Sequence, residues 1–284
     1  MKKSITMSGM YTIEIIFIIA IVFCSGCLET TYGIENIKIF QDSKGEYWLI
    51  WEMSTDEPVT YTIWMSKSQD GANWSNPEMF ASHHSSFPSI IEDRNGTYRI
   101  VWVYNEFNDS DSGIWMAYSK DGINWNTSKI IRSGGVDEDM RGVEGDMTIV
   151  GLVYRIDDLK IVEEPNGILR IFWATSEGGG DNYTVSYLQS QDGVNWSLPK
   201  RATSDDLQYY RKTENCILPK KLVFPIYDVI QTQEGKCMRV EGDGLEIFIT
   251  YSEDGINWGD MTNMLTVSNE YEKEPLIKIQ AISN

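Results

Sequence analysis

The heptapeptide Ser119-Lys120-Asp121-Gly122-Ile123-Asn124-Trp125 decides the fold of this 284-residue chain, because its pattern S-x-D-G-x-N-W occurs four times. Ser and Asp side chains accept backbone N–H bonds within a tight turn, Gly adopts positive φ, and Trp can bury its ring on the adjoining sheet. Each copy follows a β-rich stretch, namely residues 61–65, 113–118, 183–188 and 245–251. Each copy therefore predicts a strand that ends in a self-bonded turn. The residues expected to hold the four turns are Ser68, Asp70, Gly71, Trp74, Ser119, Asp121, Gly122, Trp125, Ser190, Asp192, Gly193, Trp196, Ser252, Asp254, Gly255 and Trp258.

A second repeated signature lies upstream of three of these turns. It begins with a glycine, ends with a tryptophan and places the glycine 25 residues before the Asp of the heptapeptide: Gly45 to Trp51, Gly96 to Trp102 and Gly167 to Trp173. A short apolar strand and a turn precede each glycine, and fourth strands are expected at residues 78–81 and 128–132. Each repeat thus predicts a four-stranded antiparallel meander, with the three tryptophans at equivalent positions.

The fourth repeat departs from this spacing. Gly235 precedes Asp254 by only 19 residues and its strand lacks the tryptophan, which predicts an irregular sheet. Longer connections at residues 133–158 and 202–219 precede the third and fourth repeats. Their acidic, Gly-containing composition is typical of insertions within a domain, because no Pro- or Ser-rich linker separates them from the repeats.

Composition supports an all-β chain that does not bind nucleic acid. The sequence holds 10 Trp, 15 Tyr and 23 Gly, and this combination favours strands and tight turns over helices. The formal net charge is -18. A phosphate backbone must be met by Lys and Arg, so this charge argues against a nucleic-acid surface.

The N-terminal segment has the organisation of an export signal. Lys2 and Lys3 precede an apolar run at residues 15–24, which is too short to span a bilayer. The run ends in Cys24-Ser25-Gly26-Cys27, which resembles the lipobox of prokaryotic lipoproteins. We expect a signal peptide at residues 1–26, lipid attachment at Cys27, a tether at residues 27–33 and one domain at residues 34–284. A cleaved signal without lipid and an uncleaved short anchor are the alternatives. All three predict an exported domain, either held at the extracellular face of the cell membrane or secreted.

Two cysteines remain in the exported part. Cys216 and Cys237 could form a disulfide, or both could be buried free thiols. No cysteine, histidine or carboxylate spacing predicts a metal site, since the pair His83-His84 has no further ligand nearby. No cofactor is expected.

The heptapeptide resembles the Asp-box, or BNR repeat, of the sialidase superfamily, and the resemblance covers residues 34–284. Members of that superfamily are β-propellers, with the Asp-box at the turn between the third and fourth strands of a blade. The resemblance implies a propeller of four-stranded blades. Four repeats are visible, and residues 274–280 resemble a further first strand, so we expect about five blades. An incomplete propeller or an unusual closure is the alternative.

A sialidase of this superfamily uses three arginines, an Asp acid and a Tyr activated by Glu. The F-R-I-P context of its first blade is missing here, and Arg99 and Arg170 recur at equivalent repeat positions, which predicts sheet-surface roles. The remaining candidates, if the chain is an enzyme, are Arg141, Arg155, Asp157, Asp158, Tyr209, Tyr210, Arg211 and Glu214. Resemblance to five-bladed glycosidases, which use carboxylate pairs on inner strands, would instead select Asp157, Asp158 and Asp228.

These observations favour a non-catalytic module over an enzyme. The expected function is an exported, lipid-anchored propeller that binds a glycan or a cell-surface protein. The alternative is an exo-acting, sialidase-like glycoside hydrolase that cleaves terminal sugars. The aromatic residues of the chain suit sugar stacking in either case.

Overall fold

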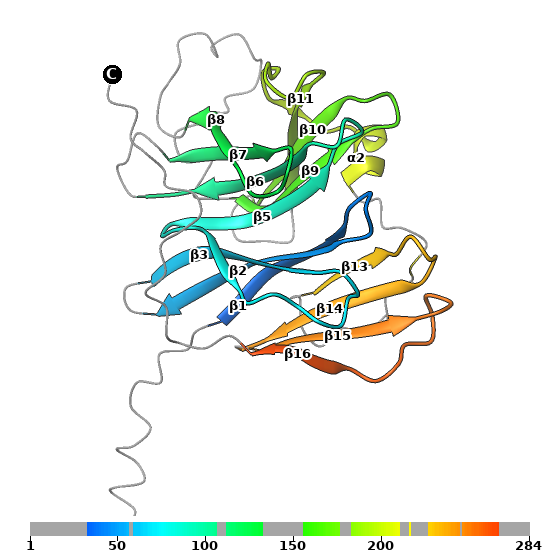
Figure 1. The fold of residues 1–284 in the computed structure, drawn as a ribbon. Coiled ribbons are helices and arrows are strands. Elements are labelled where there is room, and N and C mark those ends of the chain that lie inside the picture. The colour runs from blue at the N-terminus through cyan, green and yellow to red at the C-terminus, as the bar shows by residue number, and fades with distance from the viewer. Residues whose placement is uncertain are drawn as a thin grey trace, which may run out of the picture. The chain divides into compact units, whose positions relative to one another are not determined.

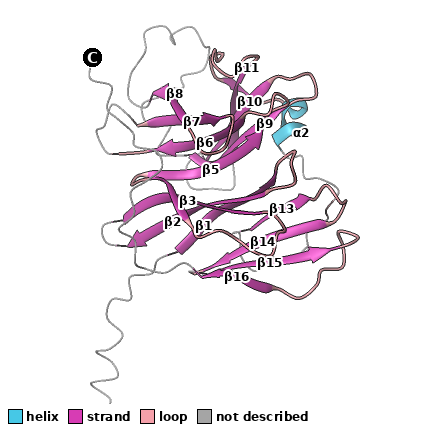
Figure 2. Cartoon of the chain, in the orientation of Figure 1, coloured by secondary structure: helices cyan, strands magenta, loops and turns pink. Residues whose placement is uncertain are grey.

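The computed structural model describes residues 33–56, 59–106, 112–132, 156–176, 183–210, 216, 227–244 and 246–266, all within one compact unit that spans Tyr32–Asn284. These residues form strands and one short helix, α2 (Ser204–Tyr210) (Figures 1 and 2). The predicted all-β class is therefore confirmed. Among the described residues, no helix has the length and apolar character required to cross a membrane.

In the described residues, sixteen strands make up four antiparallel sheets, and each sheet is a meander of four consecutive strands. We call these sheets blades 1 to 4. Blade 1 contains β1 (Gly33–Gln41), β2 (Tyr47–Asp56), β3 (Val59–Ser68) and β4 (Glu78–Ala81). Blade 2 contains β5 (Ser85–Glu92), β6 (Tyr98–Tyr104), β7 (Gly113–Ser119) and β8 (Asn126–Arg132). Blade 3 contains β9 (Ile156–Glu163), β10 (Leu169–Ser176), β11 (Tyr183–Ser190) and β12 (Lys200–Arg201). Blade 4 contains β13 (Tyr227–Gln231), β14 (Cys237–Asp243), β15 (Glu246–Ser252) and β16 (Thr262–Thr266).

The blades pack side by side in the order 4, 1, 2, 3, with their first strands inward. β1 contacts β13 of blade 4 and β5 of blade 2, and β5 contacts β9 of blade 3. The series of blades can be followed in Figure 1. Because each blade is a meander, its first-to-second and third-to-fourth turns share one end, which we call the turn end. The opposite end, where second and third strands connect, is the loop end.

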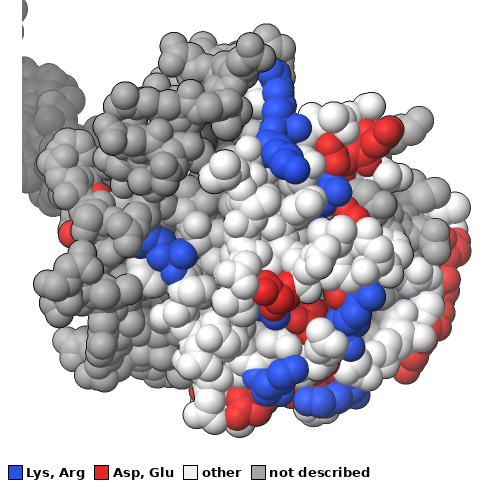
Figure 3. Space-filling view, turned by 90° about the horizontal axis from the view of Figure 1, so that it is seen from above, with Lys and Arg blue, Asp and Glu red and all other residues white. Residues whose placement is uncertain are grey.

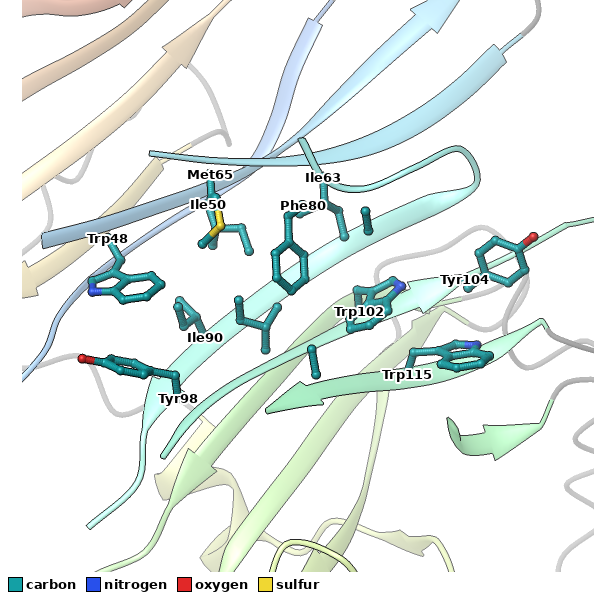
Figure 4. Packing of buried hydrophobic residues seen from close by; sticks show 13 residues of the cluster. Trp48, Ile50, Ile63, Met65, Phe80, Ile90, Tyr98, Trp102, Tyr104 and Trp115 are labelled. Carbon is teal, nitrogen blue, oxygen red and sulfur yellow. The ribbon is translucent and has the colours of Figure 1, made fainter. Parts of the chain in front are cut away.

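Three hydrophobic clusters hold neighbouring blades together. The middle strand β6 is buried at every position, because a strand between two blades has neighbours on both faces. In the cluster between blades 1 and 2, the ring of Phe80 meets Trp102 edge-on, with centroids 5.9 Å apart (Figure 4). Trp51, Trp102 and Trp173 are each 0% exposed, and each lies in the cluster facing the preceding blade of the series. Their predicted equivalence is confirmed.

The four heptapeptides form the same hydrogen-bonded turn. In the second copy, Asp121 Oδ1 accepts bonds from the backbone N–H groups of Ile123 and Asn124, and Oδ2 accepts one from Asn124 Nδ2. Ser119 Oγ accepts the N–H of Gly122. The same carboxylate contacts recur at the other three copies. In each turn, the backbone N–H of the heptapeptide Asn donates a hydrogen bond to the Asp carboxylate. This bond is the main cause that holds the pKa of each Asp well below its usual range.

The structure differs from the expectations at two places. Blade 4 is a complete four-stranded meander. Its shorter spacing comes from the seven-residue strands β14 and β15, against ten residues in β2 and β3, and from a β14–β15 connection shorter than those of blades 2 and 3. Gly244 turns the chain in this connection. The expectation of an irregular sheet was wrong on this point. The segment treated as an insertion up to residue 158 already contains the start of β9, and the second insertion contains helix α2.

Cys216 and Cys237 form a disulfide with an S–S distance of 2.03 Å, so the open choice between a disulfide and free thiols is decided. The number of blades beyond four depends on residues 267–284 and other segments outside the described part. Cys27 and the signal segment also lie outside it.

Candidate functional site

Polar side chains from all four first strands occupy one equivalent position along the inner edge of the blades. The reference point in each blade is the glycine between its first and second strands, namely Gly45, Gly96, Gly167 and Gly235. Each polar residue lies seven residues before this glycine and pairs with the residue five places after it. These residues are Lys38, Ser89, Lys160 and Asp228. We call them, together with Asp158, the axial cluster.

The axial cluster satisfies backbone groups that the inner strands cannot satisfy themselves. An innermost strand has a free edge, so some of its N–H groups lack a strand partner. Asp228 Oδ2 accepts the N–H of Ile39 at 2.9 Å, and Ser89 Oγ accepts the N–H of Ile161 at 3.2 Å. Ile39 and Ile161 are themselves equivalent in their blades. At two of the four positions, a polar side chain therefore joins a first strand to the next one around the axis.

Charges of both signs meet in the cluster. Lys38 Nζ lies 3.9 Å from Asp158 Oδ1, which links blade 1 to blade 3, two blades that are not neighbours in sequence. The two side chains remain 29% and 37% exposed, so this pair is in contact with solvent. Burial raises the pKa of Asp228, although the nearby charges of Lys38 and Lys160 and the N–H of Ile39 act in the opposite direction.

A buried carboxyl group lies close to this cluster along β1. Glu52 of β2 is 2% exposed, and its Oε2 accepts a 2.8 Å bond from Asn36 Nδ2 and a 2.9 Å bond from the N–H of Phe87. Asn36 and Lys38 are two residues apart on β1, which places their Cα atoms about 7 Å apart. Glu52 thus joins the inner strands of blades 1 and 2 next to the axial cluster and toward the loop end.

The surroundings of Glu52 have the features of a functional site. Burial raises the pKa of Glu52 to about 7, against the effect of its two hydrogen bonds, and nearby Glu35 raises it further. Asn36 and Phe87 both lie at register shifts of the inner strands and both have positive φ, 46° and 54°. Such backbone conformations are costly for a residue as large as Phe and are concentrated at binding and catalytic sites.

The repeated arginines do not form a carboxylate clamp. Arg99 is 7% exposed and lies between blades 2 and 3, where Nε contacts Asp93 Oδ2 at 2.9 Å. Arg170, at the equivalent position in blade 3, contacts Glu164 and Asp206 of α2. These arginines therefore pack between blades or against α2, and the expectation of a sheet-surface role was wrong in this respect.

Of the other candidates, the structure brings Asp158 and Asp228 to the axis. Asp157 lies in β9 beside Asp158, and Tyr209 and Tyr210 are the last two residues of α2, but their side chains are outside the described part. Arg141, Arg155, Arg211 and Glu214 also lie outside it. Their predicted roles stay predictions.

Sequence reasoning missed Glu52, Lys38 and Lys160. A signal for each was present in the repeat. Glu52 follows the signature tryptophan, where the other two full repeats have Val103 and Ala174. Lys38 and Lys160 both lie seven residues before the glycine between the first and second strands, so an alignment of the repeats that includes the first strands would have identified them.

Charges of both signs are interspersed on the face of the molecule in Figure 3. Figure 3 shows Lys and Arg side chains next to Asp and Glu side chains among the residues drawn in white, blue and red. Among the described residues, no group of three or more His, Cys, Asp or Glu side chains has the geometry to hold a metal ion.

No family model and no curated protein matches the chain. Among solved structures, it is similar to a protein of unknown function from Dyadobacter fermentans, with 16% identity and a TM-score of 0.41, over 84% of this chain and 71% of that one. It is also similar to the α-L-arabinanase of Penicillium chrysogenum complexed with arabinobiose, with 13% identity and a TM-score of 0.41, over 82% and 70%. A third is the GH43 protein BlXynB of Bacillus licheniformis, with 11% identity and a TM-score of 0.42, over 87% of this chain and 48% of that one. At these identities and TM-scores the likeness assigns no family, substrate or activity to this chain.

Proposed function

We propose that this chain is an exported, lipid-anchored β-propeller that binds a glycan at the axial cluster and does not cleave it. The observation that carries the proposal is the axial cluster. Its solvent-accessible part, Lys38 and Asp158, offers a donor and an acceptor that hydroxyl groups of a sugar can bridge. Asp228 is already engaged with the N–H of Ile39, so it acts in structure.

A glycan array tests this proposal with matched variants. Purified protein should bind neutral oligosaccharides on the array. Lys38→Gln and Asp158→Asn should each lose the signal, because each removes one half of the exposed donor–acceptor pair. Lys236→Gln is the control, since this lysine lies at the turn end and pairs with the exposed Glu253. An array without signal, or a signal that Lys38→Gln leaves unchanged, contradicts the proposal.

Glu52 favours a second candidate, a glycoside hydrolase. A glycosidase needs one carboxyl group kept protonated and another ionised, and the pKa of Glu52 raised to about 7 suits the acid. However, a general acid must reach the bond that it protonates. Glu52 is 2% exposed and its Oε2 already accepts two bonds, which supports binding over catalysis.

Chromogenic glycosides separate the two candidates. We expect no efficient release of aglycone from arabinofuranoside, xyloside, mannoside or sialoside substrates. Robust turnover that Glu52→Gln and Asp158→Asn abolish, with melting temperature retained, would establish a hydrolase of the carboxylate-pair kind. Sialoside turnover abolished by Arg211→Ala or Tyr210→Phe would establish the sialidase-like alternative.

The anchor is proposed from the sequence Ser25-Gly26-Cys27. A single acyl chain gives marginal membrane binding, so two chains or a second signal are required for stable attachment. Mass spectrometry of the protein from its native host should find a chain that begins at acylated Cys27. Retention of residues 1–26, or an unmodified Cys27, contradicts the anchor while leaving glycan binding open.

A further inference from the structure

The turn end carries three related grooves, one beside the heptapeptide of each of blades 1, 2 and 3. Their volumes are about 610, 420 and 310 Å³. The first two are closed on one side by the Gly-x pair of the next blade's heptapeptide, which is Gly122-Ile123 for the first and Gly193-Val194 for the second. The repeat thus provides an internal comparison between equivalent sites.

In two blades, the residue just before the heptapeptide serine fastens that blade to the next. Lys67 Nζ donates to the carbonyl oxygen of Gly122 at 2.9 Å and lies 3.7 Å from the centroid of the Trp48 ring. Tyr251 Oη donates to the carbonyl oxygen of Gly71 at 3.1 Å. At both places, the long polar side chain is explained by the contact that it makes between blades.

Blade 2 has Tyr118 at this position, and there the contact is made by another residue. Arg99 Nη1 donates to the carbonyl oxygen of Gly193 at 3.3 Å, so the contact between blades 2 and 3 does not need Tyr118. Tyr118 is 36% exposed, and its hydroxyl has no hydrogen bond within the part of the chain that the structure describes. Tyr118 lines the groove of 420 Å³, and its aromatic ring has no role in fastening the blades.

The rest of this groove has the chemistry that a pyranose requires. Val194, 74% exposed, lines it from blade 3, and Asn124 and Asn126 contribute side-chain amides. Asn124 Nδ2 is bound to Asp121, which leaves the Asn124 carbonyl oxygen as an acceptor, while the Asn126 amide can both donate and accept. Sugar rings present an apolar C–H face and a hydroxyl edge, which match an aromatic ring with amides beside it.

We infer that the groove between the heptapeptides of blades 2 and 3 is a second saccharide-binding site, in which a sugar ring stacks on Tyr118 and bonds to Asn124 and Asn126. It is distinct from the axial cluster, because the cluster lies on the first strands of the blades, whereas Tyr118 lies on the third strand β7, about 10 Å across the sheet from the first strand β5. The equivalent groove of blade 1 lacks such a ring, since Lys67 occupies that position. The site would give the protein two contacts on one extended glycan or two glycans bound at once.

Saturation-transfer NMR with cellotriose, xylotriose and β-1,4-mannotriose tests the site. At least one of these neutral trisaccharides should receive saturation from the aromatic protons of the purified protein. Tyr118→Ala should weaken its binding about tenfold, whereas Tyr118→Phe should keep it within about twofold, because stacking needs the ring and not the hydroxyl. Asn126→Ala should weaken it as well.

Two controls separate this site from structural effects and from the axial cluster. Gln189→Ala changes the equivalent position of blade 3 and should leave binding unchanged, and melting curves of all variants show whether they fold. Lys38→Gln should abolish binding at the axial cluster and leave the Tyr118-dependent signal, so the two proposals fail separately. The inference is overturned if no trisaccharide binds, or if Tyr118→Ala in a folded protein binds as tightly as the wild type.

Discussion

Glu52 shows how one residue can connect two blades and set a pH dependence. Its carboxylate reaches a side-chain amide on β1 and a backbone N–H on β5, both at bulges where the inner strands leave regular pairing. A hydrophobic residue here, as in the other full repeats, would leave the Phe87 N–H without this partner. The carboxyl group therefore has a structural reason to be present, although burial makes its charged form costly.

Glu52→Gln should remove a pH dependence of stability. The pKa of Glu52 is raised from 4.5 to about 7 by burial. A pKa raised on folding stabilises the folded state fully at a pH below the pKa of the group in the unfolded state. This stabilisation is lost as the pH rises through the pKa of the group in the folded state. The shift corresponds to at most about 3 kcal/mol between pH 4.5 and pH 8.

Urea unfolding at several pH values measures this effect. The wild type should lose stability from pH 5.5 to pH 8, and Glu52→Gln should lose much less, because glutamine keeps an acceptor for Phe87 without a titrating proton. Glu78→Gln, an exposed carboxylate on β4, should behave as the wild type. Equal slopes for Glu52→Gln and the wild type would show that Glu52 does not titrate in this range.

The sequence predicted the residues that a constant spacing marks and missed those whose roles depend on the packing of blades. Trp51, Trp102 and Trp173 follow from a constant spacing, and the structure buries all three in equivalent clusters. Glu52 departs from the repeat, since the other full repeats have Val103 and Ala174 there, but a single departure does not predict a role. Lys38 and Asp158 meet because β1 and β9 converge on the axis, and this distance depends on the packing of blades, which local patterns do not encode.

At the scale of the element, the heptapeptide is also a contact between blades. Its glycine has positive φ, 70° at Gly122, and a Cβ there would lie 2.4 Å from the Trp48 ring of blade 1. At Gly193 a Cβ would lie 2.4 Å from the Arg99 guanidinium of blade 2. Glycine is thus required at this position for two reasons: the turn needs positive φ, and the neighbouring blade approaches too closely for a Cβ atom.

Gly122→Ala should destabilise the protein more than Gly235→Ala. Both glycines have positive φ, which costs an alanine about 1–2 kcal/mol. Gly235 has no atom within 4 Å of an added Cβ, whereas Gly122 faces the buried Trp48 ring, and overpacking adds about 1–3 kcal/mol. The difference in unfolding free energy between the two variants measures the contact between blades. Equal losses would mean that the turn alone requires glycine.

Helix α2 illustrates what the repeat could not predict. In blade 2, Arg99 donates to the heptapeptide glycine of the next blade, whereas in blade 3 the equivalent Arg170 contacts Asp206 of α2. The helix therefore occupies the partner position that a heptapeptide has elsewhere. The spacing of the repeats does not mark α2, because it lies in a segment that is not repeated. With seven residues, the helix is also too short to show a clear apolar periodicity.

At the scale of the whole molecule, the disulfide ties a segment outside the repeats to blade 4. Cys216 and Cys237 are 21 residues apart, and both are less than 5% exposed. In the chain-entropy model a loop of this length contributes roughly 3 kcal/mol of stability. The double variant Cys216→Ala/Cys237→Ala should lose about this amount in denaturant titration. Its stability should be independent of reductant, while that of the wild type should fall when reductant is added.

Salt should stabilise the protein, because its 42 acidic residues outnumber its 24 basic residues and the excess negative charges repel one another in the folded state. Raising NaCl from 10 mM to 150 mM shortens the screening length from about 30 to about 8 Å and should relieve this repulsion. A gain of 1 kcal/mol would raise the melting temperature by about 2–4 °C in a domain of this size. Glu52→Gln should show the same increase, because salt screens surface charges and leaves the desolvation of a buried carboxyl group almost unchanged. A melting temperature that does not depend on salt, measured at pH 7.5, would mean that ion pairs such as Arg94–Glu163 already balance the surface charge locally.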